Sequence, residues 1–307
     1  MSRYYGLSDY LKLKYGRKLV KLSIDGGFTC PNRDGTLSTK GCVFCSLEGS
    51  GDFAGEISCG VKQTNGEIQS QIDSQKELLS DKWSNVGYIA YFQNYSNTYK
   101  PINELEQLYK SALTCEGVEG LAIATRPDCI EASHIELFQS NKVLWVELGL
   151  QSIHDDQNKW LNRHYELEDV VRSTKLLQEA GIPVVLHLIA GLPGETFEDF
   201  MASIDFISQL KPFGVKIHML HIVKNTALAQ IFEVKPFELL DEASYIKWVC
   251  EGIGRLDPEI VIHRMTGDGK KSEVLAPTWT FNKRHVLNGI QKYLAEHNIV
   301  QGCNRVR

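Results

Sequence analysis

The sequence has no long apolar run, and this absence bounds the class of protein. No apolar stretch approaches the roughly 20 residues that a membrane span needs. The first residues, MSRYYGLSDYLKLKYGRK, also lack the apolar core of a signal peptide. We therefore expect a cytoplasmic protein with no membrane partner. Thiols are normally reduced in the cytoplasm, which argues against disulfides among the eight cysteines.

The chain also lacks internal repeats, low-complexity tracts and linkers rich in proline, glycine or serine. Its 307 residues suit one large domain or two small ones. The content of 43% hydrophobic and 23% charged residues is typical of a globular protein.

Acidic residues are scarce at both ends of the chain. Residues 1–21 and 270–307 each carry a net charge of +5, so residues 22–269 must carry −15 to give the overall −5. Ordinary charge scatter is one interpretation, and two patches that contact a polyanion are the other. Aromatic residues lie among the basic ones, where they would either stack on a splayed base or fill a small terminal core. These are Tyr4, Tyr5, Tyr10, Tyr15, Trp279, Phe281 and Tyr293.

Short apolar runs alternate with amphipathic helical patterns along the chain. The predicted strands are 18–25, 85–93, 120–127, 143–152, 182–194 and 213–223. The predicted helices are 67–83, 103–114, 169–181 and 196–210. This alternation predicts an α/β fold with right-handed βαβ units and a parallel sheet. A partial β/α barrel and a doubly wound sheet both fit the pattern.

Polar residues gather where these strands end, and this favours the barrel. In parallel α/β folds the site is built at the carboxyl ends of the strands, and six contributing ends suggest a site surrounded on all sides. The residues are Cys30, Gln93 with Asn94, Thr125 with Arg126, Gln151 with Ser152, Gly191 to Glu195, and His221.

The stretch CPNRDGTLSTKGCVFC carries three cysteines, Cys30, Cys42 and Cys45, with the spacing C-x11-C-x2-C. Thiolates suit zinc or iron–sulfur clusters, and structural zinc takes four ligands. Cys59 would be the fourth in a zinc site, which stays an alternative. Three ligands suit a [4Fe–4S] cluster with one open iron, the kind of site that chelates S-adenosylmethionine (SAM).

The cysteine motif, with Phe44 before its last cysteine, resembles the radical-SAM superfamily in a longer-spaced variant. Further matches to the branch that includes the catalytic subunit of Elongator are YFQNYSNTY, ATRPDC, ELGLQS, LNRHY and GLPGET. The segments IDGGFTCPNRDGT, HMLHIVKNTALA and HRMTGDG resemble MnmL-like proteins of this superfamily still more closely.

This resemblance implies a partial (β/α)6 barrel at 22–230, after a basic extension at 1–21. A C-terminal extension at 231–307 would close the barrel and contact RNA. The implied cofactors are a [4Fe–4S] cluster on Cys30, Cys42 and Cys45, and SAM. An electron donor such as flavodoxin or ferredoxin would reduce the cluster.

The same resemblance implies roles for the residues around SAM. Phe44 lies beside the cluster, Gln93 faces the SAM amino group, and Thr125 follows the next strand; Gln93 as a plain loop residue is the alternative. Gln151 or Ser152 would bind the ribose, Arg163 the carboxylate, and the turn of Gly191 and Pro193 the adenine. Glu147, a lone charge inside an apolar strand, also indicates a site because such a charge is costly unless paired.

The implied reaction is on the wobble uridine of tRNA, with no DNA partner expected. It converts 5-carboxymethylaminomethyl-(2-thio)uridine to the 5-aminomethyl form. Arg126, Lys224 and Arg264 are the candidates to bind the substrate carboxylate, and His221 and Asp268 the candidates for acid–base work. Arg126 in a structural ion pair is an alternative. So are a radical-SAM reaction on another RNA or a small molecule, and a zinc-stabilised RNA-binding protein.

Overall fold

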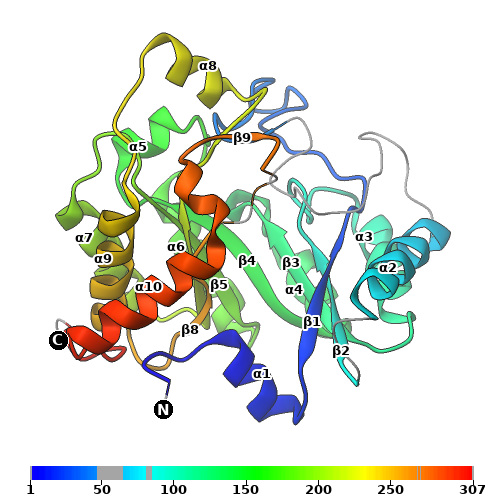
Figure 1. Cartoon of the computed structure of the whole chain (residues 1–307). Coiled ribbons are helices and arrows are strands. Elements are labelled where there is room, and N and C mark those ends of the chain that lie inside the picture. Colours follow the sequence, from blue (N-terminus) through cyan, green and yellow to red (C-terminus); the bar gives the residue numbers. More distant parts are fainter. Residues whose placement is uncertain (1, 47–64, 81–84, 268, 270, 306–307) are drawn as a thin grey trace.

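A parallel sheet curls into a partial barrel and forms the centre of the molecule (Figure 1). The computed structural model describes residues 2–46, 65–80, 85–267, 269 and 271–305. Seven strands of this described part pair in the order β1-β2-β3-β4-β5-β6-β8, every pair parallel. They are β1 (Leu19–Ile24), β2 (Gly87–Phe92), β3 (Val118–Thr125), β4 (Val143–Gln151), β5 (Val184–Ala190), β6 (Gly214–Met219) and β8 (Val261–Arg264).

Helices cover the outer face of the sheet because each presents one apolar stripe to it. In α3 the buried residues Leu105, Leu108, Tyr109 and Ala112 recur at helical spacing. Thr196 caps α7, since its hydroxyl accepts a hydrogen bond from the backbone of Asp199. The helices that follow or precede the strands are α2 (Asn65–Ser80), α3 (Ile102–Leu113), α4 (Ala132–Ser140), α5 (Asp155–Trp160), α6 (Leu167–Glu179), α7 (Phe197–Leu210), α9 (Glu242–Arg255) and α10 (Lys283–Glu296), with short 3-10 turns at Pro127–Cys129 and Thr278–Phe281.

The predicted partial β/α barrel is confirmed, with its six strands and four helices close to the expected positions; residues 81–83 of the first predicted helix lie outside the described part. Two differences concern the end of the barrel. The predicted strand 213–223 ends at Met219, and β7 (Ile222–Val223) pairs separately with β9 (Val274–Ala276). A further parallel strand, β8, extends the sheet beyond β6.

Helix α1 (Leu7–Tyr15) closes the end of the barrel at which the strands begin. It contacts both edge strands, β1 and β8. Leu11 of this helix packs in one apolar cluster with Ile89, Trp145 and Val185 of the sheet. The basic N-terminal segment therefore lies at the opposite end of the strands from the cysteine loop, which follows the carboxyl end of β1.

The aromatic residues of the two basic ends mostly fill core. The Tyr10 ring packs edge-on against Phe213, with centroids 4.8 Å apart. The Trp279 ring lies 5.3 Å from that of Tyr245, and its indole nitrogen donates to the backbone oxygen of Leu240. Tyr10 and Trp279 therefore pack against the core, as the terminal-core alternative predicts.

The opposite end of the barrel carries the cysteine loop and α8 (Ala227–Val234), seen together at the top of Figure 1. The backbone nitrogen of Leu228 donates to the oxygen of Val43, and Val43 in turn donates to Leu161. Val43, Leu161 and Leu228 share one buried apolar cluster. These contacts hold the loop over the mouth of the barrel. None of the described helices has the length and apolar character to cross a membrane.

Candidate functional site

A cavity inside the barrel opens at the carboxyl ends of the strands, beneath the cysteine loop. It collects most of the residues selected from the sequence: Cys30, Cys42, Phe44, Cys45, Gln93, Thr125, Arg126, Glu147, Gln151, His221 and Arg264. Ser152, Arg163, Gly191, Pro193 and Lys224 are not among its lining residues. Asp268 lies outside the described residues.

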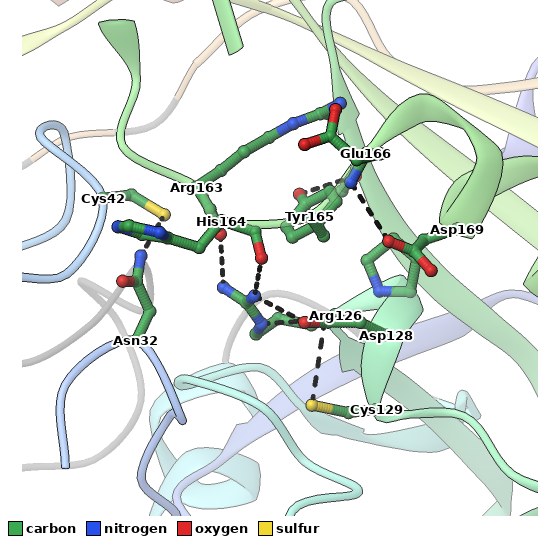
Figure 2. A network of polar contacts seen from close by, with 12 residues as sticks. Asn32, Cys42, Arg126, Asp128, Cys129, Arg163, His164, Tyr165, Glu166 and Asp169 are labelled. Atoms are coloured by element: carbon green, nitrogen blue, oxygen red, sulfur yellow. Dashed lines mark hydrogen bonds and ion pairs between the residues drawn. The ribbon is translucent and has the colours of Figure 1, made fainter. Parts of the chain in front are cut away.

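The cysteine loop is tied to the loop that follows α5. The Asn32 amide nitrogen lies 3.5 Å from the Cys42 sulfur (Figure 2). It also donates to the backbone oxygen of Asn162 at 2.6 Å. Asn162 reciprocates through a 2.7 Å hydrogen bond to the oxygen of Gly41. A hydrogen bond from Cys45, with the nearby Arg126 charge, lowers the pKa of Cys42 to about 7 although burial opposes this. The loop therefore favours a thiolate at Cys42.

The three thiols of the motif suit an iron–sulfur cluster, in which each cysteine binds a different iron. All three line the cavity. Cys59, the expected fourth ligand of the zinc alternative, lies outside the described residues.

Arg126 lines the cavity, but its guanidinium is already engaged. It forms a two-pronged ion pair with Asp128, at 2.9 and 2.7 Å, and donates to the backbone oxygens of Arg163 and His164 (Figure 2). Its carbon lies 4.8 Å from the Tyr165 ring centroid. The structural ion pair considered for this residue is therefore present, and it joins the end of β3 to the loop before α6.

Arg163 is not among the lining residues of the cavity, and the carbon of its guanidinium lies 4.4 Å from the Tyr165 ring centroid. Its side chain is about 1% exposed, and one nitrogen donates to the backbone oxygen of Leu150. Nε and Nη2 are buried with no hydrogen-bond partner in the described part of the chain. Buried guanidinium donors are normally satisfied, so this pair fits a missing anionic partner.

Glu147 is the centre of a polar cluster on the cavity floor. One carboxylate oxygen accepts from the Trp145 indole at 2.8 Å; the other accepts from the Tyr91 hydroxyl at 2.6 Å, from His187 at 2.8 Å and from Lys216. Burial alone would raise the pKa of Glu147, but Lys216 and Lys21 hold it well below its usual range. These partners supply the countercharge and hydrogen bonds that a buried carboxylate needs, and its predicted contact with the cofactor stays a prediction.

Of the remaining predicted site residues, His221 lines the cavity, whereas Ser152, Gly191 and Lys224 do not. Ser152 is buried, and its hydroxyl donates a hydrogen bond to Gln157 Oε1 at 2.5 Å. Gly191 has a φ of 83°, and its backbone nitrogen donates to the Glu195 carboxylate at 2.6 Å. Lys224 is exposed and donates to the backbone oxygen of Ser272. His221 lies against Gly267, at which no Cβ would fit.

Three residues of the cavity floor were missed from the sequence: Tyr91, His187 and Lys216. Each lies within an apolar strand. Lys216 shows the signal that singled out Glu147, a lone charge between apolar neighbours, and the same rule would have found it.

Comparisons with known proteins identify two matching family models. Residues 32–207 match the Radical SAM superfamily, and residues 212–296 match the Radical SAM C-terminal domain. The chain is 37% identical to the uncharacterized protein YtqA of Bacillus subtilis, over 98% of this chain and 92% of that protein. It is 29% identical to a tRNA uridine(34) acetyltransferase of Methanocaldococcus jannaschii, over 67% of this chain and 38% of the relative.

The fold is also that of a solved structure, the archaeal Elp3 of Methanocaldococcus infernus. The TM-score is 0.68 at 17% identity, and the match covers 92% of this chain and 64% of that one. At this identity the likeness concerns the fold alone.

Proposed function

Because the chain belongs to the radical-SAM superfamily, whose enzymes use a [4Fe–4S] cluster and SAM, we propose that it modifies the wobble uridine of tRNA. The proposed reaction converts 5-carboxymethylaminomethyl-uridine, or its 2-thio form, to 5-aminomethyl-uridine. The observation that carries the proposal is the cavity itself, which places thiols at its mouth and cationic side chains on its floor.

Residues of this chain are available to bind both the cluster and SAM. Cys30, Cys42 and Cys45 would bind the cluster. Gln93, Thr125 and Gln151 line the cavity and offer polar groups to SAM. Arg163, with its two unused donors, would bind the SAM carboxylate. When bound, the reduced cluster and SAM supply a 5′-deoxyadenosyl radical, the species that removes hydrogen from an unactivated carbon.

With the cluster and SAM bound, the glycine-like carbon of the substrate would lose one hydrogen atom and then one electron, the electron passing to an external one-electron carrier. A C=N bond forms between this carbon and the amine nitrogen. Water adds to the carbon, the C–N bond breaks, and glyoxylate leaves the aminomethyl group. His221 lines the cavity, and we assign to it the proton transfers of the hydrolytic steps.

The tRNA substrate is supported by relatives and by charge. One relative is named for its action on uridine 34 of tRNA. The two ends of this chain each carry +5, which favours contact with phosphates. A cytoplasmic location and an electron donor such as flavodoxin or ferredoxin complete the proposal.

Reconstituted enzyme, SAM and reductant, incubated with tRNA that carries the carboxymethylaminomethyl group, should yield the aminomethyl nucleoside by mass spectrometry, with glyoxylate in equal amount. Cys42→Ala protein is the matched control, since it loses a cluster ligand. If a preparation that cleaves SAM leaves this tRNA unchanged, the proposed substrate is wrong and a different radical-SAM substrate replaces it.

A further inference from the structure

The spacer between Cys30 and Cys42 folds back on itself and turns its first two side chains toward the thiols. The backbone nitrogen of Arg33 donates to the oxygen of Cys30 at 2.8 Å, and that of Gly41 to the oxygen of Asn32 at 2.7 Å. Asn32 is fully buried as a result. Arg33 is half-buried and lines the cavity together with the three thiols.

The Asn32 side chain faces the sulfur of Cys42 with its amide nitrogen. That nitrogen also contacts the backbone oxygen of Asn162, and a carbonyl oxygen can only accept a hydrogen bond. The NH2 group of the amide, and not its oxygen, must therefore lie on this side. One N–H serves Asn162, and the other is available to the Cys42 sulfur, 3.5 Å away (Figure 2). Asn32 is thus a hydrogen-bond donor to one of the cluster-binding thiols.

Arg33 places a fixed cation beside the same thiols. Its guanidinium donates to the backbone oxygens of Cys45 and Ser46, at 2.9 and 2.5 Å, and its carbon lies 5.6 Å from the Tyr95 ring centroid. Gly41 leaves the room for it, because a Cβ at this position would come within 2.8 Å of Arg33 Nε. Both oxygen acceptors are neutral, so they fix the guanidinium without cancelling its charge.

Both contacts favour the reduced state of a cluster bound to these thiols. Reduction adds one electron, so the negative charge on the cluster and its ligand sulfurs increases. A hydrogen bond to a ligand sulfur and a nearby cation each gain in strength as that charge grows, and they therefore raise the reduction potential. The burial of Asn32 adds to the effect because a hydrogen bond is electrostatically stronger away from water.

We propose that Asn32 and Arg33 are positioning residues of the cluster that raise its reduction potential, so that an external one-electron donor can reduce it. Asn32 acts through the sulfur of Cys42, and Arg33 through the segment at Cys45 that it braces. The long spacer thereby acquires a role, since it supplies both side chains between two cluster ligands. The inference depends on the [4Fe–4S] cluster of the family and not on the wobble-uridine reaction.

The test is a redox titration of reconstituted protein without tRNA, followed by the electron paramagnetic resonance of the reduced cluster. Asn32→Leu removes the donor at similar size. It should make reduction about three- to tenfold less favourable, a fall in midpoint potential of about 30–60 mV for one electron. Arg33→Gln should also lower the potential, and Arg33→Lys, which keeps the charge, should restore most of it. Lys40→Gln is the matched control, since it removes an exposed cation from the same spacer and should leave the potential unchanged.

A purely structural role gives a different result. If Asn32 and Arg33 only hold the loop, their variants bind less cluster, but the loaded fraction keeps the wild-type potential, and this outcome overturns the proposal. A measurement on the wild type covers the case in which Asn32→Leu takes up no cluster. Protein carrying asparagine labelled with 15N at its side-chain amide should show a 15N coupling to the reduced cluster by electron–nuclear double resonance, because the Asn32 nitrogen lies beside a ligand sulfur. Absence of this coupling would overturn the role of Asn32.

The outcome is separable from that of the proposed function. If the variants have a lowered potential but wild type leaves the modified tRNA unchanged, Asn32 and Arg33 keep their role and the tRNA substrate is wrong. If wild type converts the tRNA and the potentials of the variants equal that of wild type, the proposed function stands and the role of these two residues is wrong.

Discussion

Replacing Lys216 by Met should destabilise the protein because it leaves Glu147 buried without its nearest cation. Both side chains are almost fully buried, and Lys216 also donates to the Tyr91 hydroxyl at 3.0 Å. Removing one member of a buried ion pair costs about 3–5 kcal/mol. Since Lys21, Trp145 and His187 still contact the carboxylate, we expect about 3 kcal/mol, the lower end of that range.

The double variant with Glu147→Gln isolates the pair. Because no buried carboxylate then remains, we expect the double variant to be more stable than Lys216→Met by about 2 kcal/mol. This difference enters the coupling energy of a double-mutant cycle. The assay is equilibrium urea unfolding of the cluster-free protein under anaerobic, reducing conditions at neutral pH. The midpoint should shift at constant slope.

The effect of pH gives an independent check on the same reasoning. The pKa of Glu147 is held below its ordinary value of 4.5 in the folded protein. The ionised carboxylate therefore contributes stability above pH 4.5, and that contribution is lost as the pH falls further. The penalty of Lys216→Met should shrink on acidification. A penalty under about 1 kcal/mol at neutral pH, or a double variant as unstable as the single one, would refute the role of the pair.

Three further predictions concern the mouth of the cavity and the turn after β5. Cys42→Ala should abolish the broad brown absorbance of anaerobically reconstituted protein, whereas Cys303→Ala, at an exposed thiol, should keep it; a coloured Cys42 variant would contradict the ligand assignment. Arg163→Gln should raise the Kd for SAM about tenfold or more, while unchanged SAM binding would show that its two unused donors do not serve the cofactor. Burial raises the pKa of Glu195 from 4.5 to about 7 in the folded protein, so the contribution of this one group to stability is highest below pH 4.5 and is lost as the pH rises to about 7. Glu195→Gln should remove that loss. The unfolding free energy of this variant, relative to wild type, should therefore increase by about 1–3 kcal/mol between pH 4.5 and about 7. A difference between variant and wild type that does not change with pH would contradict the assignment.

The strands of the barrel were predictable because each buried strand is a nearly continuous apolar run. Strand β8 was not, since it has only four residues and two of them, His263 and Arg264, are polar. It is a strand because its backbone pairs with β6, a partner that no local pattern reveals. The same holds for β7 and β9, which are short and pair across about fifty residues of chain.

In the candidate site, too, some features were predictable from the sequence and others were not. Glu147 was recognised as a buried charge that needs partners, but the identity of those partners was not readable. Arg126 was selected as a substrate ligand, yet Asp128, two residues further along, occupies its donors. A charged side chain in a sequence indicates that a partner exists; the partner itself is known only from the neighbours in space.

The sequence by itself determined the cysteine loop, the barrel and the cofactors, because a three-thiol spacing and a run of strand-end motifs are local features with few alternative explanations. Only the tertiary structure decided what the charges do. Lys216 meets Glu147 across 69 residues of chain, and parallel pairing of β5, β6 and β8 brings His187, Lys216 and Arg264 into one row. Such a row exists only once the register of the sheet is formed, and this is why the floor of the cavity could not be read in advance.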